Sequence, residues 1–312
     1  MRHHATLRYV DAIARHGSIR RAAEALAITP SALNRRLLAL EEELDAPLFE
    51  RRARGVRLST AGEIFIHHAR RQMAEMARVR ATIEDMKGAR RGHVAIALDA
   101  SLPASGLARM LAATRAQHAG VTFAVHSCDR GTAARLLHDY TADLAIAVEP
   151  ERGGAFVTVA TAEVGLDAVL PQCHALAERG AALRLHEYLT HPLVLPPRGR
   201  SARFVLDAAA ARRDVEIAPV IEGNRRLTDA LVRDGVGLGL RMRVLPPGTA
   251  LGPTGIGAGL VAVPLDRADV PSAVLHIGQL RDRALPVPAA RFAELMVRQL
   301  AVLAGEMPSE RT

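Results

Sequence analysis

Tryptophan is absent from this chain of 312 residues, aromatic residues make up 3% of it, and Lys87 is its only lysine. The two cysteines, Cys128 and Cys173, lie far apart, which excludes a disulfide framework and fits a reducing compartment. No apolar run is long enough to cross a bilayer, and the N-terminus lacks the apolar core of a signal peptide. These absences predict a cytoplasmic protein with no membrane partner, not a secreted binding protein.

Positive charge is concentrated near the N-terminus. Residues 1–92 hold 18 Lys and Arg against 11 Asp and Glu, whereas residues 93–312 hold 23 against 22. The formal net charge of +8 therefore comes almost entirely from the first third of the chain. A basic block joined to a nearly neutral block predicts a polyanion-binding head on a body with another task.

The first 44 residues show the pattern of three short helices. Apolar residues at helical spacing predict a first helix over residues 4–15. Ser18 is a natural N-cap for a second helix over residues 19–26, and Thr29 caps a third helix with Pro30 at its first position. The apolar stripe of this third helix is Leu33, Leu37, Leu40 and Leu44. Helix, short turn and helix form a helix-turn-helix, whose second helix enters the major groove of DNA.

Polar side chains around the start of the third helix are the candidates for reading bases. Asn side chains can read adenine and Arg side chains can read guanine. We expect the DNA-facing residues to be Ser18, Thr29, Pro30, Ser31, Asn34, Arg35 and Arg36.

An arginine-rich hairpin is expected next, over residues 48–58. Arg51 and Arg54 lie near its tip, where they would meet phosphates or the minor groove. A solvated charge run is the alternative interpretation, but the position directly after a helix-turn-helix favours a wing.

A long amphipathic helix follows. Thr60 and Glu63 have the spacing of a capping box, and apolar residues repeat at steps of three or four as far as Met86. A helix of this length needs a partner for its stripe, so we predict pairing between two protomers. Packing of the stripe against the chain's own body is the alternative.

The pattern changes after a basic hinge over residues 88–92. Alternating strands and helices predict a parallel sheet with helices on its faces, in two lobes joined near residues 160–164 and 266–270. The expected strands cover residues 93–98, 121–125, 143–148, 166–170, 193–195, 220–222, 237–240 and 274–278. The expected helices cover residues 107–118, 132–140, 201–212, 227–233 and 289–303.

Ligands of open α/β sheets bind at the carboxyl ends of the strands, often against helix N-termini. Segments at such positions in this chain are expected to supply polar side chains that contact a ligand, and arginines that would pair with an anionic one. Each of these residues has the alternative of being a helix cap or a loop residue. The candidates are Ser101, Ser127, Thr132, Ser201 and Asn224, with Arg198 or Arg200 for an anion.

Other chemistries find little support. Cys128 and Cys173 fall in different expected lobes, beyond the reach of a disulfide switch. His67 and His68 are adjacent on a helix and face different ways, so they make a poor metal pair. No grouping of nucleophile, base and orienting residue stands out, so we expect no catalytic, metal or cofactor site. An enzyme or a plain solute-binding module is the alternative if the head is degenerate, and absence of DNA binding would reveal it.

The head resembles the LysR-type transcriptional regulators. The resemblance covers Leu7 to about Arg91, and its most specific part is residues 17–63, GSIRRAAEALAITPSALNRRLLALEEELDAPLFERRARGVRLSTAGE. In that family, the residues that match Thr29, Ser31, Asn34 and Arg35 face the DNA, as does the wing that matches Arg51 and Arg54. The family often has Gln where this chain has Pro30 and Ser where it has Asn34, which leaves the operator preference open.

Shorter pieces of the body resemble the effector domain of the same family, a fold similar to periplasmic binding proteins. They are the strand at residues 143–146, LPQCHALAERG at 170–180, HPLVLPPRG at 191–199 and RDGVGLGL at 233–240. We therefore expect an α/β protein with an N-terminal winged helix-turn-helix and a long linker helix, followed by a two-lobed effector domain.

The expected boundaries are residues 1–59 for the DNA-binding domain, 60–91 for the linker helix and hinge, and 92–305 for the effector domain. Lobe I takes residues 92–163 and 269–305, and lobe II takes residues 164–268. The resemblance implies pseudo-palindromic promoter DNA, a small-molecule effector, a homodimer or homotetramer, and contact with RNA polymerase if the protein is an activator. It leaves open whether the protein activates or represses.

Overall fold

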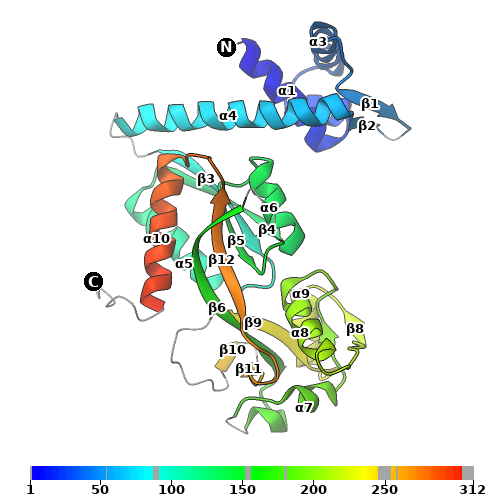
Figure 1. Ribbon diagram of the computed structural model, residues 1–312, viewed down its shortest axis with the longest axis vertical. Coiled ribbons are helices and arrows are strands. Elements are labelled where there is room, and N and C mark those ends of the chain that lie inside the picture. Colours follow the sequence, from blue (N-terminus) through cyan, green and yellow to red (C-terminus); the bar gives the residue numbers. More distant parts are fainter. Residues whose placement is uncertain are drawn as a thin grey trace. The chain divides into compact units, whose positions relative to one another are not determined.

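The computed structural model of the chain describes residues 2–53, 55–86, 91–151, 156–178, 181–244, 254–257 and 259–303. The chain divides into two compact units, residues 1–89 with 138–140, and residues 90–137 with 141–312. Helices make up most of the first unit, and a large curled sheet runs through the second (Figure 1). None of the helices in the described ranges is long and apolar enough to cross a membrane.

The first unit begins with the three expected helices, α1 (Arg2–His16), α2 (Ile19–Ala25) and α3 (Pro30–Glu43). The backbone N–H of Arg21 donates to the Ser18 hydroxyl, and that of Ala32 donates to the Thr29 hydroxyl, so both predicted N-caps are confirmed. The three helices bury a shared apolar core. Its fully or almost fully buried members include Leu7, Val10, Ile13, Ala22, Ala23, Leu33, Leu37 and Leu40.

The predicted wing is confirmed as an antiparallel pair, β1 (Phe49–Arg52) and β2 (Gly55–Leu58). Glu41 on α3 holds the entry to the wing, because its Oε1 accepts hydrogen bonds from the backbone N–H groups of Leu48 at 2.7 Å and Phe49 at 3.1 Å. Gly55 lies against the turn after α1 with a φ of +125°, and a Cβ there would collide with the Gly17 carbonyl. Only glycine therefore fits this approach between wing and turn.

The long helix α4 covers Thr60–Met86, as predicted, but the expected capping box is wrong by one residue. Ser59 precedes the helix, and its hydroxyl accepts a hydrogen bond from the Gly62 N–H at 3.0 Å. Ser59 is therefore the N-cap, which leaves Thr60 inside the helix.

The apolar stripe of α4 divides into two halves. Ile66 and Ala69 are buried in the core of the head. Met76, Val79 and Ile83, further along the same helix, are 43–46% exposed. The first half of the stripe therefore packs on the chain's own head, and pairing of the exposed second half between two protomers stays a prediction.

One mixed sheet forms the centre of the second unit. Its strands are β3 (Gly92–Asp99), β4 (Val121–Cys128), β5 (Leu144–Val148), β6 (Phe156–Pro171), β9 (Gly239–Val244), β10 (Thr254–Gly257), β11 (Leu260–Pro264) and β12 (Ala273–Leu280). Their order is β10-β11-β6-β12-β5-β3-β4, with β9 also paired to β6. Strand β3 is parallel to β4 and β5, whereas β6, β9, β10, β11 and β12 pair antiparallel.

The expectation of a parallel sheet is therefore wrong for five of its eight strands, which pair only antiparallel, although the two-lobed α/β fold class is confirmed. The cause is β6, a strand of 16 residues of which only residues 166–170 were expected. Its first part pairs with β12, and its last part pairs with β9 and β11 (Figure 1). The first expected connection between the lobes, near residues 160–164, is therefore part of the continuous strand β6.

Helices and short strands complete this unit. Helices α5 (Ser105–Gln117), α6 (Arg130–His138), α8 (Ser201–Ala211), α9 (Arg225–Arg233) and α10 (Val287–Leu303) were all expected. The short strands β7 (Val194–Leu195) and β8 (Ile221–Glu222) were also expected, and they pair with each other in a separate parallel sheet that was not. The one-turn elements η1 (Ala175–Ala177) and α7 (Leu185–Leu189), like β10 and β11, were not, because such short pieces carry little periodicity.

We expect Gly62→Ala to destabilise the head. A methyl group at this position of α4 would collide with the Leu48 carbonyl, and we expect a cost of about 1–3 kcal/mol. Gly106→Ala in α5 is the matched control, because a Cβ there meets nothing within 4 Å. Urea unfolding should give a lower midpoint for Gly62→Ala only, and equal midpoints for the two variants would contradict this account.

Candidate functional site

The side chains expected to read bases gather at the start of α3. Ser31, Asn34 and Arg35 are spaced three and four residues apart, so they share one face of the helix, opposite buried Leu33 and Leu37. Ser31 and Arg35 are exposed, and Asn34 is half-buried. This face is therefore free to meet a ligand as large as a nucleic acid.

Three of the other expected residues have structural partners of their own. Thr29 caps α3, with its hydroxyl 3.2 Å from that of Ser31, and Ser18 caps α2. Arg36 donates a hydrogen bond to the Tyr9 hydroxyl at 2.7 Å, with its guanidinium over the Tyr9 ring. Arg36 is thus positioned by α1 while still exposed.

The wing adds further cations beside this helix. Arg51 and Arg57 are exposed. Arg52 pairs with Glu50 at 2.7 Å, which leaves it less available to a phosphate. Arg54 lies outside the described residues.

A cavity of about 370 Å³ lies in the second unit, among residues from several elements. Four of the predicted residues line it, namely Ser101, Ser127, Arg200 and Asn224. Ser101 lies just after β3, and Ser127 lies at the end of β4. The N-cap residues of α8 and α9 are Arg200 and Asn224. The remaining lining residues are Ala100, Pro196, Pro197, Ala202, Gly223, Arg225, Arg226, Thr228, Leu240 and Arg241.

A buried carboxylate organises one side of this cavity. Asp99, at the end of β3, is 1% exposed and accepts hydrogen bonds from the backbone N–H groups of Ser101 at 2.9 Å and Val148 at 3.2 Å. The Ser201 hydroxyl donates to the same carboxylate at 2.5 Å. Ser201 is therefore fully buried and does not line the cavity, although it was a candidate contact.

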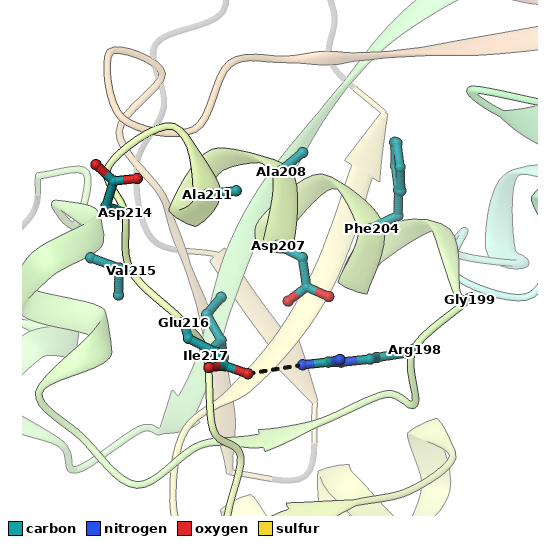
Figure 2. Close-up of a pocket in the computed structure, with 10 residues that line it drawn as sticks. All are labelled: Arg198, Gly199, Phe204, Asp207, Ala208, Ala211, Asp214, Val215, Glu216 and Ile217. Atoms are coloured by element: carbon teal, nitrogen blue, oxygen red, sulfur yellow. Dashed lines mark ion pairs between the residues drawn. The ribbon is translucent and has the colours of Figure 1, made fainter.

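Thr132 and Arg198 also lie away from the cavity. Thr132 lies in the first turn of α6, where its hydroxyl donates to the Asp129 carboxylate at 2.7 Å and accepts from the Asp129 backbone N–H at 2.9 Å. The same carboxylate accepts from the Thr132 backbone N–H at 3.0 Å, so Asp129 caps the helix and Thr132 supports that cap. Arg198 lines a separate hollow of about 670 Å³ along α8, where it forms an ion pair with Glu216 at 3.6 Å (Figure 2). Figure 2 also shows Asp207 beside this pair, so the hollow is not a favourable place for an anion.

Three arginines of the cavity were not among the candidates. Arg225 and Arg226 follow the N-cap Asn224, so recognising that cap as the start of α9 could have found them. Arg241 lies on β9, which was expected to end at residue 240. Arg241 pairs with Asp229 at 3.1 Å, and among the described residues its Nε has no hydrogen-bond partner.

The lining has the character of an anion site. Four arginines line it, and among the described lining residues there is no Asp or Glu. Helices α8 and α9 begin at the cavity, and helix N-termini favour negative charge. A small molecule with a carboxylate or phosphate group matches this arrangement.

Behind Arg241 lies a second buried carboxylate. Asp167 on β6 is 2% exposed, and burial raises its pKa to about 6, although Arg243 and Arg241 oppose that rise. Burial likewise lowers the pKa of Arg241. Burial therefore disfavours the charged forms of both Asp167 and Arg241 beside the cavity.

The two cysteines differ in their surroundings. Burial, followed by the charge of Asp99, raises the pKa of Cys128 to about 12, so its thiol is protonated at neutral pH. Cys173 is exposed. In the described parts of the chain, no cluster of three or more His, Cys, Asp or Glu residues could hold a metal ion.

Residues 4–63 match the family described as bacterial regulatory helix-turn-helix protein, lysR family. Residues 87–301 match the LysR substrate binding domain. Among relatives, the RuBisCO operon transcriptional regulator of Allochromatium vinosum is 28% identical over 234 residues, which is 74% of this chain and 76% of the relative. The transcriptional regulator PunR of Escherichia coli is 42% identical over 94 residues, 30% of each chain.

Solved structures show the same fold over nearly the whole chain. A full-length OxyR variant from Pseudomonas aeruginosa superposes with a TM-score of 0.69 at 16% identity, covering 99% of this chain and 98% of that one. Full-length CbnR in complex with its target DNA gives a TM-score of 0.64 at 19% identity, covering 96% and 99%.

The raised pKa of Asp167 predicts a pH dependence of stability. Its folded pKa of about 6 lies above its ordinary value, so the folded state holds this proton more tightly than the unfolded state. As pH rises from about 4 to about 6, this group should reduce the free energy of unfolding by on the order of 2–3 kcal/mol. Urea unfolding of wild type and Asp167→Asn at pH 4, 5, 6 and 7 measures this. The wild type should lose more stability over that range, and parallel pH profiles would contradict it.

Proposed function

The chain belongs to the LysR family of bacterial transcriptional regulators, and on that premise we propose that it reads a pseudo-palindromic promoter site and responds to a small anionic effector. The observation that carries the effector assignment is the cavity lined by four arginines and two helix N-termini. The exposed face of α3, with the wing behind it in sequence, supports the DNA assignment. The protein acts by binding, not by catalysis.

The proposed DNA contacts follow from the geometry of the head. Asn34 and Arg35 meet base edges in the major groove, and Thr29, Pro30 and Ser31 approach the same groove from the start of the helix. Arg51 meets phosphates beside it, and Arg54 is proposed for the same role from its sequence position. Ser18 and Arg36 flank this surface, each held by its own bond within the head.

The exposed half of α4 supports a homodimer, which can pair further into a homotetramer. Met76, Val79 and Ile83 lie on one stripe of that helix, and a second copy of the same stripe would cover them. A dimer presents two recognition helices, so its half-sites are spaced by one or more turns of DNA. We place the domain boundaries at residues 1–59, 60–91 and 92–305, with lobe II formed by residues 164–268.

The proposed effector site consists of the lining residues with charge or hydrogen-bonding capacity. Arg200 and Arg241 meet the anionic group, and Ser101, Ser127 and Asn224 orient the rest of the molecule. Ser201 supports the site indirectly, as the partner of Asp99, and Thr132 stabilises the start of α6 through its hydrogen bond to Asp129. Arg198 remains outside it, in the hollow shown in Figure 2.

The proposed regulation couples this site to DNA. An effector that favours one arrangement of the two lobes shifts the population toward that arrangement. In a dimer or tetramer this shift changes the placement of the heads and so the bend of the DNA. Contact with RNA polymerase then follows if the protein is an activator.

Loss of Arg35 and Arg51 should abolish site-specific binding. We expect wild type to enrich a discrete palindromic site from genomic fragments, and the Arg35→Ala plus Arg51→Ala double variant to lose it. The slope of log K against log salt should fall by roughly 2 per dimer through the loss of the two Arg51 contacts. DNA pull-down at two salt concentrations measures both effects.

The matched control removes the same charge from the body. Arg115 and Arg298 are exposed on α5 and α10, so Arg115→Ala plus Arg298→Ala should bind DNA as wild type does. Equal binding by all three proteins, or binding by none, would show that the head is no sequence reader.

Small dicarboxylates should bind the cavity through Arg200. We expect succinate to raise the melting temperature of the wild type by mass action, and uncharged succinamide to have no effect. Arg200→Gln should weaken succinate binding at least tenfold in calorimetry, whereas Arg198→Gln, in the separate hollow, should bind as wild type. Unchanged binding by Arg200→Gln, or equal binding of succinamide, would refute the assignment.

A further inference from the structure

Leu38 is an exposed leucine on α3, the helix that we propose enters the major groove of DNA. It is 48% exposed, and it is not among the described apolar residues that form the core of the head or pack against that core. A single exposed leucine is ordinary on a protein surface, so its exposure alone carries no meaning. What matters is the face of the helix on which it lies.

Leu38 lies in the middle of the reading face of α3. Ser31 begins this face, and Asn34 and Arg35 follow it by three and four residues. Leu38 follows Ser31 by seven residues, so it shares their side of the helix, opposite the buried leucines of the same helix. A recognition helix can read the major groove with four residues at this spacing. Leu38 is therefore placed to meet a base.

The chemistry of leucine limits which base it can favour. In the major groove, only thymine presents an apolar group, its C5-methyl. A leucine side chain can neither donate nor accept a hydrogen bond, so against the polar edge of another base it would displace water without replacing the lost bonds. Against thymine it buries a methyl group instead. Leucine at this position thus favours thymine.

The charge around Leu38 favours DNA as the surface that covers it. Arg35 and Arg36 are exposed on the same helix, and residues 1–92 hold 18 Lys and Arg against 11 Asp and Glu. Phosphates would pair with these cations, whereas an apolar protein surface would have to bury them. Glu42, one turn beyond Leu38, is the first acidic residue on this face. Leu38 is therefore the last residue of the face before the charge changes sign.

We propose that Leu38 reads the C5-methyl group of one thymine in each half-site of the operator. This inference rests on the proposed function, in which α3 enters the major groove. Leu38 lies three residues beyond Arg35, which is about 4.5 Å along the helix axis. Successive base pairs are about 3.4 Å apart, so the thymine lies one or two base pairs from the base that Arg35 reads.

Replacing thymine by deoxyuridine tests the proposal, because this change removes the C5-methyl group and keeps the base pair. The probe is the promoter fragment that the wild type enriches. Each thymine of a half-site, on either strand, is replaced in turn and symmetrically in both half-sites. At one position we expect the full-length wild type to bind about fourfold more weakly per half-site, and roughly tenfold or more for the symmetric fragment. Fluorescence anisotropy at a fixed salt concentration measures this.

Leu38→Ala should lose this preference, because its side chain no longer reaches the methyl group. We expect it to bind the thymine fragment about as weakly as the wild type binds the deoxyuridine fragment, and to bind both fragments alike. Its urea midpoint should match that of the wild type, since truncation of an exposed leucine leaves no cavity.

Leu44→Ala is the matched control. Leu44 is the C-cap residue of α3 and is 41% exposed, but it lies four residues after buried Leu40, on the core side of the helix. This variant should keep the affinity of the wild type and its preference for thymine.

Each other outcome overturns the proposal. If no deoxyuridine replacement weakens the wild type, no thymine methyl is read. If Leu38→Ala keeps the preference, another residue reads the methyl, and if Leu44→Ala loses it as well, the effect belongs to the helix and not to a contact. A wild type that binds no discrete site would overturn the proposed function, and this inference with it. A discrete site without methyl dependence would overturn this inference alone.

Discussion

The buried carboxylate of Asp99 is the interaction on which the effector domain's cavity depends. It ends strand β3 and accepts hydrogen bonds from Ser101, Val148 and Ser201, so it ties the loop after β3, the end of β5 and the start of α8 to one point. A carboxylate that is 1% exposed is tolerable only with such a full set of donors. Because Ser101 is one of these residues and Arg200 directly precedes Ser201, Asp99 fixes the positions of two residues that line the cavity.

Arginine carries the positive charge of both units, in two different settings. On the head, Arg35 and Arg51 are exposed, as the proposed hydrogen bonds to DNA bases and phosphates require. In the effector domain, Arg241 and Arg243 are partly buried on β9, the strand that pairs with the strand of Asp167, and fewer water molecules screen their charge there. The exposed arginines thus lie where we propose DNA contact, and the partly buried Arg241 lies where we propose a small anion.

Local signals allowed the head to be predicted almost residue by residue, since the caps Ser18 and Thr29 and the glycine turn lie within a few residues of what they control. The long strand β6 could not be predicted, because its pairing with β9, β11 and β12 joins distant segments. The same holds for Ser201, whose partner Asp99 is 102 residues away. Sequence position alone could place Ser101, Ser127, Arg200 and Asn224 near strand ends or helix starts, but it could not show that Arg241 turns toward the same space.

The coupling between an anion in the effector cavity and the DNA is the central claim, and a nuclease footprint tests it most directly. The footprint is taken on the promoter fragment that the wild type enriches, with and without the carboxylate that binds its effector cavity most tightly. We predict that this carboxylate changes the length of the footprint or its sites of enhanced cleavage in the wild type and not in Arg200→Gln. A footprint that stays the same while the carboxylate saturates the cavity would contradict the account.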